Sequence, residues 1–351
     1  MPDAYIVKSD NYNNDFNMPV LTANKAFILG YTNEENSYNK PSIIFDDFTL
    51  DRKYVDFPYM LKSSAIKILT SKNQHNLRFL FERLNSTRFE VLGHARHYIS
   101  VVQNTTTLCP SVNEEVCISN LLTKFDELIT LHQRKLDNLK LKKKALLQKL
   151  FPKNGERYPE LRFPGFTDAW EQRKFGEIYE RAGQKNDLTY GIDKIISVAN
   201  MYFKKDVTVG SEEYLKTYNI FKLGDIAFEG HTSKEYRYGR FVENTIGDGI
   251  VSHIFDVFTP KINLDINFWK DLIKYEPIMG PILRRCTKAS RMMSNLTAKE
   301  FLEEQTLCPT LEEQKLIGEF IVSLDKNITL HQRKLEHLQL QKKALLQQMF
   351  V

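Results

Sequence analysis

The stretch Ile129-Thr130-Leu131-His132-Gln133-Arg134-Lys135-Leu136 occurs a second time, letter for letter, at 328–335. Seven residues after its last leucine, each copy continues with Lys-Lys-Ala-Leu-Leu-Gln, at 143–148 and 342–347, so matched positions differ by 199. The same offset relates the sequence Thr-Leu-Cys-Pro at 107–110 to its copy at 306–309. Two uninterrupted copies of this length indicate an internal duplication.

Each copy has the apolar spacing of a long amphipathic helix. Apolar residues recur in alternating steps of three and four if two polar positions of each copy, His132 and Lys143 or His331 and Lys342, are admitted to the series. This is the pattern of a coiled-coil seam that contains two polar residues. Neither 121–151 nor 320–350 contains Pro or Gly, and at 1.5 Å per residue each helix would be roughly 45 Å long. Such a narrow apolar stripe requires a partner, so we expect the two copies to pair. The alternative is that each helix only covers the core of its own domain. The positions predicted to pair are Leu122, Phe125, Ile129, His132, Leu136, Leu139, Leu146 and Leu150 in the first copy, and Ile321, Leu324, Ile328, His331, Leu335, Leu338, Leu345 and Met349 in the second.

The composition is that of a packed globular protein with a small excess of positive charge. The chain has 351 residues, 42% hydrophobic residues and a formal net charge of +5, which permits an anionic partner without requiring one. Its four cysteines have no metal-ligand spacing, so we predict reduced thiols and no metal site. No signal peptide and no apolar run of membrane-spanning length is evident, so we expect an intracellular protein without a membrane anchor.

The duplication divides the chain into four parts. We predict a globular domain at 1–106, a helix region at 107–152, a second globular domain at 153–305 and a second helix region at 306–351. The globular parts match each other weakly: 20–24 aligns with 196–200, 45–49 with 228–232, and 64–70 with 252–259. The offset drifts from 176 through 183 to 189, as loop insertions would produce. Short β-rich runs and one helical run, 76–84, indicate mixed α/β domains with a curved, mainly β core.

The helices are therefore repeated closely and the globular parts are not. If both halves carried out the same chemistry, the chemically active residues should repeat best. We infer that each globular part recognises a different target.

Several local stretches carry a resemblance to a known family. They are Glu-Leu-Arg-Phe-Pro-Gly-Phe at 160–166, Trp170-Glu171, Gly-Asp-Ile-Ala-Phe at 224–228, Pro-Thr-Leu-Glu-Glu-Gln at 309–314 and the 342–347 sequence. Together with the order of domain, helix, domain, helix, they resemble the specificity subunit of type I restriction-modification systems over almost the whole chain.

The resemblance implies both a fold and a function. The fold would be α+β, with two target-recognition domains separated by two long helices that pair as an antiparallel coiled coil. Each domain would bind one half of a split sequence in double-stranded DNA. The subunit would be non-catalytic and hold no cofactor, and it would work in the bacterial cytosol. It would direct two modification (methyltransferase) subunits, and restriction subunits that translocate DNA and cut it. Those partners would use S-adenosylmethionine, ATP and Mg²⁺.

One departure from a perfect repeat concerns the first domain. Aligning Val20 with Ile196 places Met1 opposite Glu177, so the first half has no counterpart of the segment 159–176. We call this segment the lead-in. Either the first domain is shortened at its start, or the coding sequence begins late.

Candidate DNA contacts are the basic and polar side chains that crowd predicted loops. Such side chains read base edges and hold phosphates, and helices of this length would place the two reading domains about 13 base pairs apart. The candidates are Lys25, His94, Arg96, His97 and Tyr98 in the first domain, and Lys204, Lys205, His231, Thr232, Ser233, Lys234, Arg237, Arg284, Arg285, Lys288, Ser290 and Arg291 in the second. For any single residue, the alternative is a solvated surface charge.

Two other classes of function were weighed. One is a catalytic DNA-modifying enzyme, but the chain has no phosphate-binding Gly-rich loop ending in Gly-Lys-Ser/Thr, no HExxH motif and no Asn/Asp-Pro-Pro-aromatic motif of the kind that amino-methyltransferases use. Asp46, Asp47, Asp51 and Asp56 could form a nuclease site, but no matching pattern repeats in the second half. A coiled-coil scaffold unrelated to DNA would explain the helices and leave the basic loops without a role.

Overall fold

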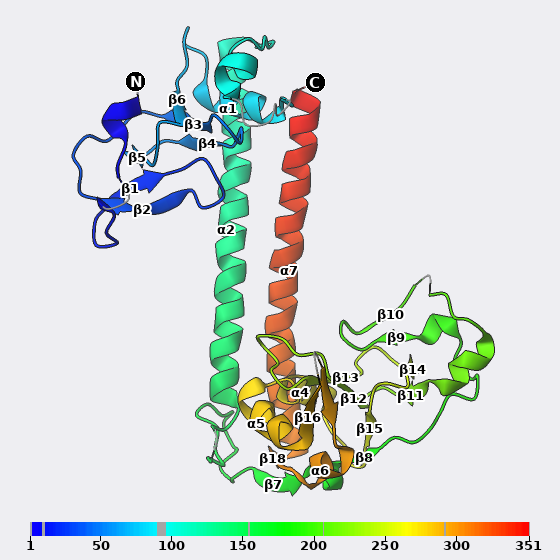
Figure 1. The fold of residues 1–351 in the computed structure, drawn as a ribbon. Helices are drawn as coiled ribbons and strands as arrows, with labels where there is room; N and C mark the ends of the chain where they lie inside the picture. Colours follow the sequence, from blue (N-terminus) through cyan, green and yellow to red (C-terminus); the bar gives the residue numbers. More distant parts are fainter. Residues whose placement is uncertain are drawn as a thin grey trace. The chain divides into compact units, whose positions relative to one another are not determined.

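The computed structural model describes residues 2–8, 11–89, 96–153, 155–205, 207–290 and 293–350. The chain forms two compact units (Figure 1). Unit 1 comprises Met1–Arg134 and Gln332–Val351, and unit 2 comprises Lys135–His331. Two long helices, α2 (Val112–Leu150) and α7 (Leu311–Met349), each contribute one part to unit 1 and the other part to unit 2.

Both long helices begin nine residues before the stretches 121–151 and 320–350 from which their lengths were predicted. Their starts have the chemistry of helix amino termini. The hydroxyl of Ser111 accepts a hydrogen bond from the Glu114 amide at 3.4 Å, and that of Thr310 accepts one from the Glu313 amide at 3.4 Å. Hydroxyl caps satisfy amides that have no partner within the helix, and acidic residues in the first turn favour its positive end.

The described globular part of unit 1 contains two small sheets and the helix α1. One sheet has the order β2-β1-β5, with β1 parallel to β5, and the other has the order β4-β3-β6, antiparallel throughout. The helix α1 follows β6. The elements are β1 (Met18–Leu21), β2 (Ile28–Thr32), β3 (Ser42–Asp46), β4 (Arg52–Val55), β5 (Met60–Leu61), β6 (Ile66–Leu69) and α1 (Leu77–Ser86), with short helical turns at Pro2–Tyr5 and Tyr98–Val102.

Unit 2 has a larger globular part around the sheet β13-β12-β15-β8. Two-stranded pairs β10-β9, β11-β14, β16-β17 and β18-β7 surround it. The elements are β7 (Glu171–Lys174), α3 (Phe175–Ile178), β8 (Tyr179–Arg181), β9 (Ile196–Ser197), β10 (Tyr202–Phe203), β11 (Asn219–Phe221), β12 (Ile226–Glu229), β13 (Arg240–Glu243), β14 (Gly249–Val251), β15 (Val257–Pro260), α4 (Ile266–Leu272), α5 (Glu276–Cys286), β16 (Thr287–Ser290), β17 (Met293–Leu296), α6 (Ala298–Glu303) and β18 (Gln305–Cys308), with turns of 3₁₀ helix at Ile192–Lys194 and Glu212–Thr217.

Strand pairing confirms that the globular parts are related. In unit 1, β3 lies between β4 and β6, and Ile44 pairs with Ile68. In unit 2, β12 lies between β13 and β15, and Ala227 pairs with Val257. These pairs reproduce the offsets of 183 and 189 found in the sequence, and they confirm the predicted α+β class.

The apolar core of unit 2 includes the ends of both long helices. The buried residues include Leu150, the last residue of α2, and Phe151, which follows it. Ile317 and Ile321 near the start of α7 are also buried with the aromatic residues of the globular part. No helix in the described ranges is long and apolar enough to cross a bilayer.

Candidate nucleic-acid interface

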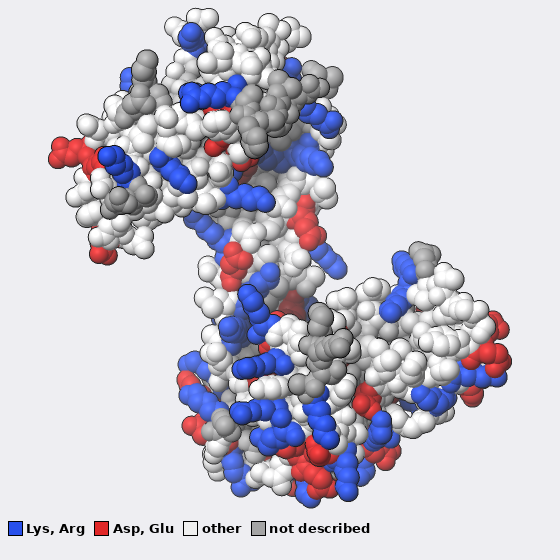
Figure 2. Space-filling view, viewed as in Figure 1, with Lys and Arg blue, Asp and Glu red and all other residues white. Residues whose placement is uncertain are grey.

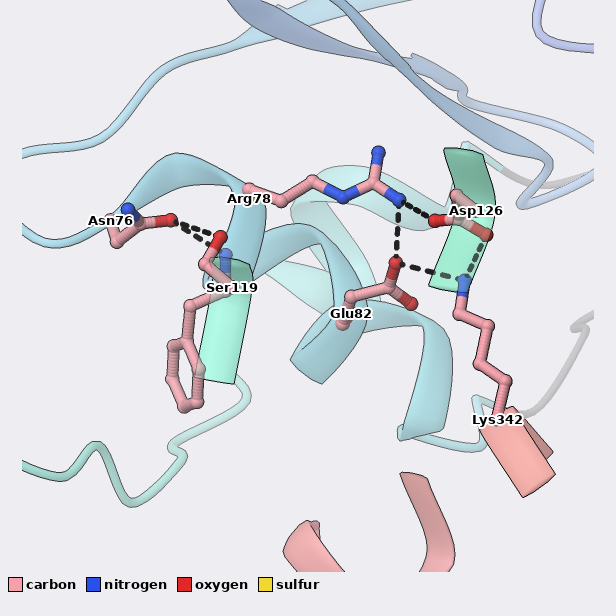
Figure 3. Close-up of polar contacts among 7 residues, drawn as sticks. Asn76, Arg78, Glu82, Ser119, Asp126 and Lys342 are labelled. Atoms are coloured by element: carbon pink, nitrogen blue, oxygen red, sulfur yellow. Dashed lines mark hydrogen bonds and ion pairs between the residues drawn. The ribbon is translucent and has the colours of Figure 1, made fainter. Parts of the chain in front are cut away.

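In unit 1, the carboxyl-terminal part of α7 is joined to α2 and α1 by ion pairs (Figure 3). The Lys342 ammonium lies 2.7 Å from Asp126 of α2 and 3.6 Å from Glu82 of α1. Arg78 of α1 binds both carboxylates. Two positive and two negative groups therefore meet where the three helices converge.

Unit 2 repeats this arrangement with the helices exchanged. The Lys143 ammonium of α2 lies 2.7 Å from Asp325 of α7 and 3.2 Å from Asp271 of α4. Lys270 is 3.6 Å from Asp325 and supplies the second positive charge. Burial alone would lower the pKa of Lys143, but Asp271 and Asp325 outweigh it and raise that pKa.

These two clusters explain the lysines within the predicted seam. Asp126 matches Asp325 and Lys143 matches Lys342, both with the offset of 199. Each unit thus pairs the amino-terminal part of one long helix with the carboxyl-terminal part of the other, which confirms the predicted antiparallel arrangement. All residues predicted for the seam are buried or half-buried.

Helix α1 in unit 1 and helix α4 in unit 2 are docked on the long helices by matching contacts. Asn76 caps α1 by accepting from the Phe79 amide at 3.0 Å, and its own amide donates to Glu115 of α2 at 2.7 Å. Asp265 caps α4 by accepting from the Phe268 amide at 2.8 Å, and its own amide donates to Gln314 of α7 at 3.1 Å.

Aromatic rings complete this docking. Phe79 lies 5.3 Å from Phe350 after α7, and Phe268 lies 5.8 Å from Phe151 after α2, measured between ring centroids. The same scaffold therefore holds both globular parts.

One matched position differs in a way that the packing explains. The hydroxyl of Ser119 donates to the Asn76 side chain at 2.9 Å, as drawn in Figure 3. Its counterpart is Gly318, where an added Cβ would lie 2.3 Å from the Asp265 carboxylate. Each residue suits the cap that approaches it, so a glycine stands within α7 despite its low helix propensity.

Two of the three groups of candidates predicted in the second domain lie on segments that contact each other. The Ser294 amide donates to the Gly230 carbonyl at 2.7 Å, and His231 forms a bridge with Met293. The β12–β13 loop (230–239) therefore contacts the β16–β17 hairpin. A Cβ at Gly230 would lie 2.2 Å from the Ser294 carbonyl oxygen, so this close approach requires glycine.

A salt bridge and backbone contacts hold the base of the β12–β13 loop. Arg240 lies 2.6 Å from Glu229, donates to the Ala199 carbonyl at 3.0 Å and stacks on Tyr236. Burial would lower the pKa of Arg240, but Glu229 outweighs it and raises that pKa. Arg240 stays charged and orders the loop.

Most candidates in unit 2 are exposed. Figure 2 shows Lys and Arg side chains over the part of unit 2 that carries α5 and β16. Arg285 is bound by Glu304 through two hydrogen bonds of 2.8 and 2.5 Å, so its charge is already paired. The exposed candidates are Lys204, Lys205, His231, Thr232, Ser233, Lys234, Arg237, Arg284 and Lys288; the side chain of Ser290 and all of Arg291 lie outside the described residues.

The candidates in unit 1 are more scattered. Lys25 is exposed in the β1–β2 turn and Arg96 is exposed before the turn Tyr98–Val102. His97 is fully buried, its amide donates to the Asp47 carbonyl at 2.8 Å, and its ring lies 3.1 Å from the same oxygen. The structure places His97 in the interior of unit 1 rather than on its surface, where it contacts the backbone of Asp47. Tyr98 is half-buried against Phe45, and His94 lies outside the described residues.

Two features were missed by reasoning from sequence. Tyr202 is 50% exposed on β10, close in sequence to Lys204 and Lys205, and an exposed aromatic ring beside lysines suits nucleic-acid stacking. The ligand-type atoms of His75, Cys109 and Glu115 lie within 4.8 Å of one another. Residues this far apart in sequence gave no motif, and Glu115 is already bound by the His75 ring and the Asn76 amide.

Comparison with known proteins gave both sequence and structural relatives. No family model matches the chain. It is 26% identical, over 356 aligned residues, to the type I restriction enzyme EcoR124I/EcoR124II specificity subunit of Escherichia coli, covering 92% of this chain and 83% of that protein.

A solved structure of low sequence identity shares the fold. The type I restriction-modification S subunit from M. genitalium matches with a TM-score of 0.57 at 15% identity, covering 99% of this chain and 92% of that one. The HsdS subunit from Thermoanaerobacter tengcongensis matches with a TM-score of 0.46 at 14% identity, covering 88% and 80%. The sequence match over most of both chains agrees with the repeated helices, and this chain is similar over most of its length to a type I restriction enzyme specificity subunit.

Proposed function

We propose that this chain is the DNA sequence-specificity subunit of a type I restriction-modification enzyme, working in the bacterial cytosol. It binds a split target in double-stranded DNA, one half with each unit. It directs adenine methyltransferase and restriction-translocase partners to that target. The observation that carries this proposal is a common docking scaffold bearing loops that differ between the units.

The loops differ beside the central strand of each sheet. In unit 1, β3 and β4 are joined by the short connection 47–51. In unit 2, the equivalent strands β12 and β13 are joined by 230–239, which carries Lys234 and Arg237. One conserved framework with separately diverged loops suits a protein that reads two unrelated half-sequences.

The exposed side chains support binding to an anionic surface. Lys and Arg side chains position a protein on the phosphates, and Asn, Gln, Arg and Lys read base edges in the major groove. In unit 2, Lys234, Arg237 and Lys288 are exposed on the two segments that Gly230 and Ser294 join. We propose these as phosphate or base contacts, with Lys25 and Arg96 in unit 1.

We assign no chemical step to this chain. S-adenosylmethionine, ATP and Mg²⁺ belong to the partners in this proposal. The matched ion-pair clusters around Lys143 and Lys342 support two related docking faces for two modification subunits, because each presents the same elements in the same order.

Mapping of methylated adenines across the genome tests the function directly. We expect a split methylation motif that disappears when this gene is deleted. Exchange of residues 1–106 for those of another specificity subunit should change one half of the motif. A methylation pattern that does not change on deletion would refute the proposal, as would DNA turnover by the isolated chain with Mg²⁺ and S-adenosylmethionine.

Binding measurements test the basic surface of unit 2. Replacing Arg237 and Lys288 together by alanine should lower affinity for duplex DNA about tenfold or more, and reduce the salt dependence by about two phosphate contacts. Lys216→Ala is the matched control, since Lys216 is exposed and pairs with Glu213 elsewhere in unit 2. Equal losses of DNA affinity in the control and in the double variant would show that this surface does not bind DNA. If the chain binds no DNA, alone or with its methyltransferase partner, it is a scaffold instead.

A further inference from the structure

The lead-in covers a definite surface of unit 2. Arg162 binds Glu313 through two hydrogen bonds of 2.8 and 2.7 Å, and that carboxylate is almost fully buried. The ring of Phe163 lies 6.0 Å from Phe320 of α7. The lead-in therefore neutralises one acid and shields one apolar side chain on the first turns of α7.

The remainder of the lead-in supplies a strand and a tryptophan. Strand β7 pairs with β18 from Gln305 to Cys308. The ring of Trp170 lies 5.8 Å from Phe268, and the Leu161 amide donates to the Lys149 carbonyl at 2.8 Å. The lead-in thus contacts α4, α7 and the end of α2 together.

Unit 1 has the surface that corresponds to the one covered by the lead-in in unit 2. None of the described residues of unit 1 covers this surface as the lead-in does. Glu114, the counterpart of Glu313, is exposed and has no ion pair among the described residues. Leu121, the counterpart of Phe320, is 38% exposed. Leu108, the counterpart of Leu307, is 87% exposed, and its segment pairs with no strand in the described part of the chain.

This surface also contains a hollow. A depression of about 290 Å³ is lined by Phe79, Leu108, Glu114, Ile118 and Phe350, among others. It is bordered by Thr107-Leu108-Cys109-Pro110, the sequence that in unit 2 begins within β18 and precedes α7. The backbone of 106–109 belongs to no sheet in the described part of the chain, and such an unpaired edge can accept an added strand through backbone hydrogen bonds.

We propose that unit 1 carries a docking surface for an extended polypeptide segment with the chemistry of the lead-in. The segment provides an arginine for Glu114, an aromatic ring for Leu121, a tryptophan or similar ring near Phe79, and a short strand for 106–109. Charge complementarity, the unpaired edge and the occupied counterpart in unit 2 argue for this occupant. The inference does not depend on DNA binding.

The chain contains the probe for this test. A fluorescein-labelled peptide of residues 157–176 is titrated into the full-length protein and followed by anisotropy. We expect saturable binding that Glu114→Arg weakens at least tenfold. A peptide with Arg162→Glu should bind wild-type protein at least tenfold more weakly and recover affinity for the Glu114→Arg variant. Hydrogen exchange should show new protection of the amides at 107–109.

Matched controls separate this site from exchange into unit 2. Glu312→Arg places the same charge change on an exposed residue of the first turn of α7, and it should leave peptide affinity unchanged. Binding that survives Glu114→Arg would reveal exchange with the resident lead-in and overturn the proposal. Absence of binding to wild-type protein would also overturn it. Self-association that Glu114→Arg abolishes, without peptide binding, would identify a second copy as the occupant and likewise overturn it.

Discussion

The two units share a docking framework and differ in what covers it. In both, a capped helix is held between the start of one long helix and the end of the other, with a lysine between two carboxylates. Only unit 2 adds Trp170, Phe163 and Arg162 around this framework. The same scaffold therefore does not guarantee the same stability. Both tryptophans of the chain, Trp170 and Trp269, belong to unit 2, so their fluorescence reports its unfolding separately.

The largest expected effect comes from the phenylalanine that anchors each docked helix. Phe268→Ala should destabilise unit 2 by about 4–5 kcal/mol, because its ring is fully buried against Phe151, Trp170 and Trp269. Phe79→Ala should cost unit 1 about 3 kcal/mol, since fewer rings surround it. Urea unfolding followed by tryptophan fluorescence measures unit 2, and a Tyr54→Trp reporter in both backgrounds measures unit 1. Equal losses would show that the lead-in adds no packing.

The exchange of Ser119 and Gly318 should be asymmetric. Gly318→Ser forces a Cβ to within 2.3 Å of the Asp265 carboxylate and should cost about 2–3 kcal/mol. Ser119→Gly removes one hydrogen bond and lowers helix propensity, and should cost about 1–2 kcal/mol. Gly318→Ala serves as the control that separates the clash from the hydroxyl. If all three variants have the same urea midpoint of unfolding as the wild-type protein, the capping residues Asn76 and Asp265 do not limit which residue can stand at positions 119 and 318.

The lysine clusters should behave alike if the duplication governs them. Lys143→Met and Lys342→Met should each cost about 1–2 kcal/mol, because each removes one charge from a mostly buried group of four. The loss in free energy of unfolding should be smaller if one neighbouring carboxylate is also neutralised, as in the double variant Lys143→Met with Asp325→Asn. Differential scanning calorimetry of the single and double variants gives the coupling. A loss confined to one lysine would mean that only one cluster contributes.

The smallest expected effect is a dependence on pH in unit 2. Asp225 matches Ser42 of unit 1 with the offset of 183, and burial raises the pKa of Asp225 to about 6 from 3.8. The folded state therefore holds its proton more tightly than the unfolded chain. The stability of unit 2 should fall as pH rises from about 4 to about 6. Asp225→Asn should flatten this slope and add about 1 kcal/mol at pH 7.5. Unfolding of unit 2 followed by tryptophan fluorescence between pH 4 and 8 measures this dependence of stability on pH. If the variant shows the same dependence as the wild-type protein, another group causes it.

Reasoning from sequence reached some of these features and missed others for physical reasons. The exact repeat predicted the helix pair and the polar positions at Lys143 and Lys342, because periodicity records which face of a helix is covered. It did not predict that Gly230 would bring the β12–β13 loop against Ser294, because that contact joins segments more than sixty positions apart. Nor did it predict that His97 would be buried, since its burial depends on the contact with Asp47, which lies fifty positions earlier in the chain.

The sequence alone determined the order of domains and helices, the duplication, the α+β class and the pairing of the helices. Each of these depends on local spacing or on direct repetition of the sequence. Only the tertiary structure decided which carboxylates Lys143 and Lys342 meet, which basic loops lie together, and that Glu114 and Leu108 are exposed where Glu313 and Leu307 are covered. The physical reason is that ion pairing and burial depend on distances between segments remote in the chain, which no local pattern encodes.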